Sequence, residues 1–136
     1  MESIRIEKTQ KTPLFILEDG YVQISGRSIP QNSKELYQVC LDWVEQYIES
    51  PKPETKIILY YEYIDTSSTR CLMDILKVLS KIPQQNSQNK IVINWYYEQG
   101  DHDLHDLGTH IEAHLNVPFN IISLDEGKEI PEIITD

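Results

Sequence analysis

Hydrophobic residues fall into six short strand-like runs and three longer stretches with helical spacing. The strand-like runs are residues 4–8, 14–18, 21–25, 56–63, 91–97 and 118–124. The helical stretches begin at Asn32, just after Asp65 and at residue 103. The predicted order is therefore three strands, then helix, strand, helix, strand, helix, strand (βββαβαβαβ). Single helices between strands imply right-handed crossovers, so we expect one α/β domain with a mixed, partly parallel sheet and about three helices.

Turn-forming and helix-stopping residues separate these segments. Residues 18–21 (Glu-Asp-Gly-Tyr) predict a hairpin between the second and third strands, and residues 26–30 predict a loop. Asn32 is a suitable cap for the first helix. Pro83 is expected to end the second helix after Ile82, which leaves a polar linker at 84–89.

Two apolar runs, residues 56–63 and 91–97, are nearly continuous rather than alternating. Such runs are typical of central strands that are covered on both faces. The last eleven residues are instead rich in carboxylates. We therefore expect a domain at 1–125 followed by an acidic C-terminal tail at 126–136.

Composition and charge exclude several classes of function. Of the 136 residues, 40% are hydrophobic, which is enough for a packed core. The net charge of −10 argues against nucleic acid and anionic membrane surfaces, which are bound by clustered Lys and Arg. No apolar run is long enough to span a membrane and no signal peptide is evident, so we expect a cytoplasmic protein. Cys40 and Cys71 are expected to be buried free thiols.

Four histidines lie within 13 residues of the third helical stretch: His102, His105, His110 and His114. Because His110 and His114 are four residues apart, they would share one helix face, and a small metal-dependent enzyme is one hypothesis. The other interpretation is an exposed acidic helix that contains imidazoles. No distant third ligand, glycine-rich phosphate loop or nucleophile elbow completes a site, so we predict no metal, no cofactor and no catalytic residue.

A hydroxyl-rich sequence, residues 65–70 (Asp-Thr-Ser-Ser-Thr-Arg), joins the fourth strand to the second helix. It follows a buried strand and so emerges at the carboxyl edge of the sheet, where open α/β sheets place functional sites. It also begins a helix, whose free amides and positive dipole end favour a phosphate. One interpretation is a phosphorylation site, with Arg70 assisting and Asp65 and Glu62 opposing the added charge. The other is simple helix capping by Asp65 or Thr66.

A second candidate surface is the predicted loop with Gly26, Arg27 and Ser28, followed by Asn32. Backbone amides together with the guanidinium of Arg27 can form an anion-binding nest. Gly and Ser are also common turn formers, so a surface turn leading to a capped helix is the more frequent outcome.

Residues 63–72 (Tyr-Ile-Asp-Thr-Ser-Ser-Thr-Arg-Cys-Leu) resemble the Tyr-Phe-Asn-Thr-Ser-Ser-x-Lys signature of the SiaC-like family of bacterial regulatory phosphoproteins. Further segments match the family's pattern in the same order: Thr12-Pro13 and residues 24–33, 41–44, 93–97 and 117–119. Asp65 replaces the family's Asn, which keeps the capping ability and adds a charge. Arg70 replaces its Lys and keeps the positive charge.

The resemblance implies a fold similar to the anti-sigma-factor antagonists, the STAS type, and a protein-binding switch without enzymatic activity. A partner kinase would phosphorylate Thr66, with Ser67 and Ser68 as alternates, and a PP2C-type phosphatase would reverse the reaction. The unphosphorylated form would bind and activate a diguanylate cyclase, raising cyclic-di-GMP and promoting biofilm formation. The partner-binding residues would be Tyr63, Asp65, Thr66, Ser67, Ser68 and Arg70. The alternative within this fold is an anti-sigma-factor antagonist that acts on an anti-sigma kinase.

Overall fold

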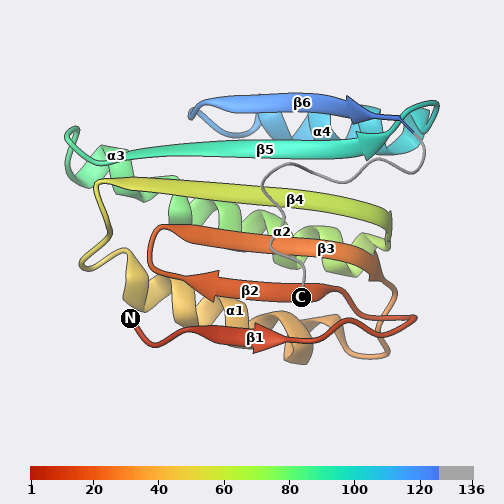
Figure 1. Ribbon diagram of the computed structural model, residues 1–136, viewed down its shortest axis with the longest axis horizontal. Coiled ribbons are helices and arrows are strands. Elements are labelled where there is room, and N and C mark those ends of the chain that lie inside the picture. Colours follow the sequence, from red (N-terminus) through yellow and green to blue (C-terminus); the bar gives the residue numbers. More distant parts are fainter. Residues whose placement is uncertain (126–136) are drawn as a thin grey trace.

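Six strands lie side by side in the order in which they occur in the chain (Figure 1). The computed structural model describes residues 1–125. The strands are β1 (Ile4–Ile6), β2 (Leu14–Glu18), β3 (Tyr21–Ser28), β4 (Glu54–Ile64), β5 (Lys90–Glu98) and β6 (Phe119–Leu124). The helices are α1 (Ser33–Tyr47), α2 (Thr66–Leu79), α3 (Lys81–Gln85) and α4 (His102–Ala113). The predicted α/β class and the mixed sheet are confirmed, and the predicted tail at 126–136 lies outside the described residues.

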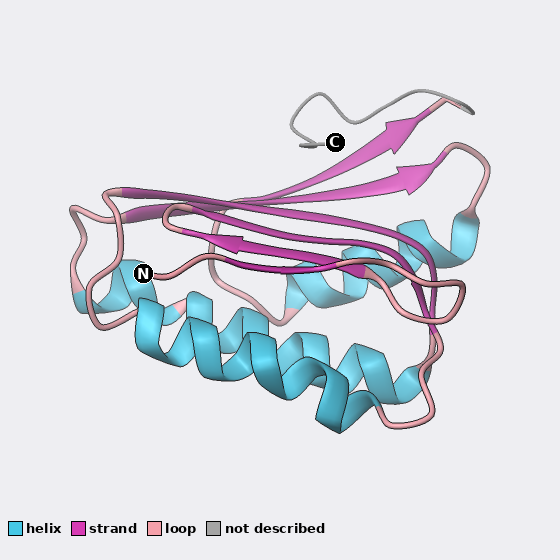
Figure 2. Cartoon of the chain, turned by 60° about the horizontal axis from the view of Figure 1, so that its bottom comes forward, coloured by secondary structure: helices cyan, strands magenta, loops and turns pink. Residues whose placement is uncertain are grey.

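Only β2 runs opposite to the other strands of the sheet. Strands β1, β2 and β3 pair antiparallel, whereas β3, β4, β5 and β6 pair parallel. Each parallel connection moves to the next strand on the same side. Because such crossovers are right-handed, three successive steps in one direction place all their helices on one face of the sheet. Figure 2 shows this arrangement, with the helices on one face and no described helix on the other.

The side chains of β4 alternate between the two faces of the sheet. Ile57, Leu59 and Tyr61 belong to the main core beneath the helices. Ile58 belongs to a smaller cluster with Tyr96 on the helix-free face, where both are buried. The continuous apolar run at 56–63 therefore reflects one apolar cluster on each face, and not helices on both faces.

The second helical stretch is two helices rather than one. Helix α2 ends at Leu79, and Pro83 lies inside the short helix α3 instead of terminating a longer one. Proline has no N–H to donate to the carbonyl four residues earlier, which is that of Leu79, so an unbroken helix cannot pass this point. Pro83 is compatible with the first turn of a new helix. The polar linker predicted at 84–89 therefore begins two residues later than expected, after α3 ends at Gln85.

The loop predicted at 26–30 is wrong in its first half, because β3 continues to Ser28. Arg27 and Ser28 pair in register with Tyr63 and Ile64 of β4. Gly26 permits this course, since its φ of 120° is rarely adopted by other residues. None of the helices in the part of the chain that the structure describes is long and apolar enough to cross a membrane.

Candidate functional site

The first turn of α2 lies at the carboxyl edge of the sheet, directly after β4. Asp65 caps the helix: its Oδ1 atom accepts a hydrogen bond from the backbone N–H of Ser68 at 2.8 Å. The backbone N–H and the hydroxyl of Thr69 both donate to the Asp65 carbonyl oxygen, at 3.0 and 2.9 Å. Of the two predicted caps, Asp65 is correct and Thr66 is instead the first helical residue.

The three hydroxyls that follow Asp65 differ sharply in accessibility. Thr66 and Ser67 are exposed, whereas Ser68 is 0% exposed. The Ser67 hydroxyl donates to Asp65 Oδ1 at 3.4 Å. Among the described residues the Thr66 hydroxyl has no hydrogen-bond partner. The structure thus presents Thr66 to solvent and retains Ser68 in the core.

A buried chain of hydroxyls lies beneath this turn. Ser28 Oγ donates to Ser68 Oγ at 2.8 Å, and Ser28 Oγ and Tyr37 Oη are also 2.8 Å apart. Tyr37 Oη is 3.1 Å from Tyr61 Oη. These four side chains come from β3, α1, β4 and α2, so the hydrogen bonds connect the first turn of α2 to both the sheet and the neighbouring helix. Ser28, which the sequence placed on a surface loop, is therefore a core residue.

The two tyrosines of the network remain uncharged over the physiological range. Burial raises the pKa of Tyr37 to about 12, against a smaller lowering by its hydrogen bond to Ser28. Burial likewise raises the pKa of Tyr61 well above its ordinary value. The network is thus a neutral support for the site and carries no charge of its own.

A β-bulge turns Tyr63 outward next to the site. The pairing passes from Gly26–Tyr61 to Arg27–Tyr63, so β4 carries Glu62 as an extra residue. Tyr61 is buried, but Tyr63 two positions later is 50% exposed. Arg27 is the register partner of Tyr63, and this pairing brings the two surfaces predicted from the sequence together at one edge.

The remaining residues singled out from the sequence are a helix cap, an arginine and two cysteines. Asn32 caps α1, with its Oδ1 accepting from the N–H of Glu35 at 3.1 Å, as expected. Arg70 is exposed, one turn after Thr66. Both cysteines are free as predicted, but only Cys40 is fully buried and Cys71 is half-buried.

A groove of about 320 Å³ between α1 and α2 adjoins the exposed turn. Its α2 side includes Ser67, Arg70 and Cys71, and its α1 side includes Lys34 and Gln38. No motif in the sequence marks the two α1 residues. Both are polar positions on an amphipathic helix, and nothing in their local pattern distinguishes a groove from an ordinary solvated face.

The four histidines are spread along α4 and its C-cap; His102, His110 and His114 are exposed, and His105 is half-buried. The rings of His110 and His114 are 4.5 Å apart, and His114 Nδ1 lies 2.9 Å from the backbone carbonyl oxygen of His110. His105 Nδ1 is 3.1 Å from a carboxylate oxygen of Asp106. Within residues 1–125 no group of three or more His, Cys, Asp or Glu side chains is placed to hold a metal ion.

Comparison with known proteins connects this architecture to one family. The model of the SiaC family regulatory phosphoproteins matches residues 6–124. An uncharacterized protein of Pseudomonas aeruginosa (strain UCBPP-PA14) is 29% identical over 128 residues, which cover 93% of this chain and all of the relative.

Solved structures agree with this match. The structure of SiaC of Pseudomonas aeruginosa superimposes with a TM-score of 0.80 at 28% identity, covering 91% of this chain and 100% of that one. A crystal structure of the diguanylate cyclase SiaD in complex with its activator SiaC, also from Pseudomonas aeruginosa, contains a chain with a TM-score of 0.79 and 27% identity, covering 89% of this chain and 99% of that one. The family model and the solved structures each match most of the chain, and the chain belongs to the SiaC family of regulatory phosphoproteins.

Proposed function

We propose that this protein is a phosphorylation-controlled switch that binds and activates a diguanylate cyclase when Thr66 is unmodified. Two findings support the partner: the family is one of regulatory phosphoproteins, and SiaC of Pseudomonas aeruginosa is the activator in a complex with the diguanylate cyclase SiaD. In this proposal the chain acts on an enzyme rather than as one, and the output is cyclic-di-GMP signalling that promotes biofilm formation.

The observation that carries the proposal is the exposed hydroxyl of Thr66 at the first position of α2, which has no hydrogen-bond partner within residues 1–125. A kinase must reach the hydroxyl that it modifies, which favours Thr66 and Ser67 over Ser68. Phosphate on Ser68 would require the buried bond from Ser28 to break. The resemblance to the family signature selects Thr66 rather than Ser67. A partner kinase and a PP2C-type phosphatase are therefore part of the proposal.

The local charges indicate that modification would spare the fold. A phosphate at the helix N-terminus gains roughly 0.3–1 kcal/mol from the helix dipole. The neighbouring carboxylates of Asp65 and Glu62 oppose it with exposed interactions that are each about 0–1 kcal/mol. These terms nearly cancel, so the folded state should tolerate the phosphate.

A phosphate on Thr66 should affect partner binding much more than it affects folding. A partner that packs on the bare first turn of α2 would have to bury a group with about −1.5 to −2 charges. Burying a charge without a matching partner costs several kilocalories per mole, and a cost of about 4 kcal/mol weakens binding roughly a thousandfold. The same modification therefore leaves the protein folded and abolishes the complex.

A cytoplasmic location fits the two free thiols, which are typical of a reducing compartment.

Phosphosite mapping tests the assignment. The chain is co-expressed with its kinase and analysed by mass spectrometry as wild type, Thr66→Ala and Ser67→Ala. We expect phosphate in the wild type and in Ser67→Ala but none in Thr66→Ala. Phosphate that persists in Thr66→Ala would contradict the choice of acceptor.

Affinity capture of the cyclase tests the switch itself. Thr66→Ala removes the acceptor but no structural hydrogen bond, so it should retain the cyclase, and Thr66→Glu should lose it. Equal retention by the two variants would count against control through this position.

A further inference from the structure

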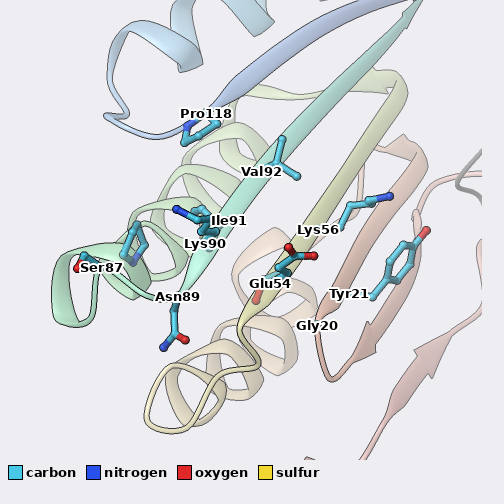
Figure 3. Close-up of a pocket in the computed structure, with 12 residues that line it drawn as sticks. Gly20, Tyr21, Glu54, Lys56, Ser87, Asn89, Lys90, Ile91, Val92 and Pro118 are labelled. Atoms are coloured by element: carbon cyan, nitrogen blue, oxygen red, sulfur yellow. The ribbon is translucent and has the colours of Figure 1, made fainter.

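A cavity of about 970 Å³ lies at the end of the sheet opposite to Thr66, and Figure 3 shows the residues that line it. It forms where β4 and β5 begin, at Glu54 and Lys90. Strand β4 has 11 residues, so its two ends are roughly 33 Å apart at about 3.3 Å per residue. The cavity is therefore separate from the phosphorylation site, and an inference about it does not depend on the proposed switch.

The cavity walls are largely apolar. Tyr21 of β3 and Ile91 and Val92 of β5 line it on either side of β4. Pro83 of α3 and Pro118, which precedes β6, also contribute. A concave space of this size with apolar walls and few polar groups is typical of small-molecule sites.

Two lysines bring positive charge to these apolar walls. The strand register places Lys56 between Tyr21 and Val92, and places Lys90 beside Glu54. Within the described residues neither lysine forms an ion pair, although acidic residues outnumber basic ones by 22 to 12 in the chain. Two lysines and one acidic residue, Glu54, are among the residues that line the cavity, so its lining carries a net positive charge in a strongly acidic protein.

Hydrogen bonds hold this end of the sheet in a fixed shape. The N–H of Lys56 donates to the Gly20 carbonyl oxygen at 2.9 Å. The buried hydroxyl of Tyr47 accepts from the N–H of Gly20 at 3.0 Å and lies 2.7 Å from Thr55 Oγ1. Gly20 has a φ of 77°, and a Cβ atom there would lie 3.1 Å from the Glu54 carbonyl oxygen. The cavity is thus formed before any ligand arrives, which lowers the entropy lost on binding.

We propose that this cavity binds a small anionic ligand with a flat apolar body. The apolar body would pack against Tyr21 and Val92, and the anionic group would be attracted by the positive charge of Lys56 and Lys90. Charge complementarity selects the anion, because the lysines otherwise lack described acidic partners. The site gives the protein a small-molecule input at the far end of the sheet from Thr66.

Two fluorescent probes test the charge and the apolar body separately. The anionic probe is 8-anilinonaphthalene-1-sulfonate, and the neutral probe is N-phenyl-1-naphthylamine, which has the same aromatic body without the sulfonate. In the full chain we expect saturable 1:1 binding of both. The double variant Lys56→Ala/Lys90→Ala should weaken sulfonate binding by roughly tenfold, because it removes two charge-assisted contacts. It should leave the neutral probe's affinity nearly unchanged.

Matched variants locate the binding. Lys34→Ala/Lys77→Ala removes the same charge from exposed positions of α1 and α2, outside this cavity, and should bind both probes like the wild type. Val92→Glu places a carboxylate in the apolar wall and should abolish binding of both. Absence of sulfonate binding to the wild type, equal binding by the two lysine double variants, or unchanged binding by Val92→Glu would each overturn the proposal.

Discussion

Replacing Ser28 with alanine removes the hydroxyl at the centre of the buried network under the first turn of α2. Ser28 Oγ lies 2.8 Å from both Ser68 Oγ and Tyr37 Oη. Ser28, Tyr37 and Ser68 are at most 2% exposed, so water cannot take the place of the missing group. The substitution therefore leaves two buried hydroxyls each short of one partner.

The size of the effect follows from these contacts. Each lost hydrogen bond contributes about 1 kcal/mol net, and an unsatisfied buried hydroxyl adds about 1–3 kcal/mol. Tyr37 keeps its bond to Tyr61, which limits its share. We expect Ser28→Ala to lower the free energy of unfolding by about 2–3 kcal/mol, a large part of the 5–15 kcal/mol typical of a domain.

Urea denaturation followed by circular dichroism measures this loss, and Ser80→Ala is the matched control. Ser80 is also buried, but its hydroxyl donates only to the Leu76 carbonyl oxygen, at 2.7 Å. That carbonyl also accepts the backbone N–H of Ser80 at 2.9 Å, so no buried group is left unpaired. The control should cost less than about 1 kcal/mol. If the two variants are equally stable, the network does not hold α2 in place as described.

Two further predictions concern the core. Gly108→Ala should lower stability by about 1–3 kcal/mol, because the new Cβ would lie 2.5 Å from Trp95 Cδ1 and displace an indole that donates to the Leu104 carbonyl oxygen at 3.0 Å. An unchanged or higher Tm would refute this. The free energy of unfolding should also fall as pH rises from about 10 to 12, since Tyr37 ionises near 10.0 when unfolded but has a pKa of about 12 when folded. Tyr37→Phe should flatten this fall in urea titrations at several pH values, and an identical pH dependence would contradict it.

Local signals in the sequence located most elements of the fold. Asp19-Gly20 was enough to identify the hairpin, because Gly20 supplies the positive φ that the turn requires. The change between strand and helix periodicity limited the cap of the second helix to Asp65 or Thr66, and the structure places it at Asp65. Gly108 was unfavourable for a helix by propensity alone, and its contact with Trp95 explains its presence.

The features that the sequence did not reveal depend on distant partners. Ser28 looked like a turn residue because Gly26 and Pro30 surround it, but pairing with Ile64 and a bond to Ser68, 40 positions away, place it in the core. Likewise, the accessibility of Thr66 relative to Ser68 depends on how α2 packs against α1 and β3. The location of all the described helices on one face depends on the strand order, which no local pattern encodes.

In the proposed switch, phosphate on Thr66 turns off activation of a diguanylate cyclase without unfolding the protein. The direct measurement is the rate of cyclic-di-GMP formation by the cyclase with unmodified protein and with protein fully phosphorylated on Thr66, both verified as folded by circular dichroism. We predict strong activation by the unmodified form and activity near that of the cyclase alone with the phosphorylated form. Equal activation by the two forms would contradict the account.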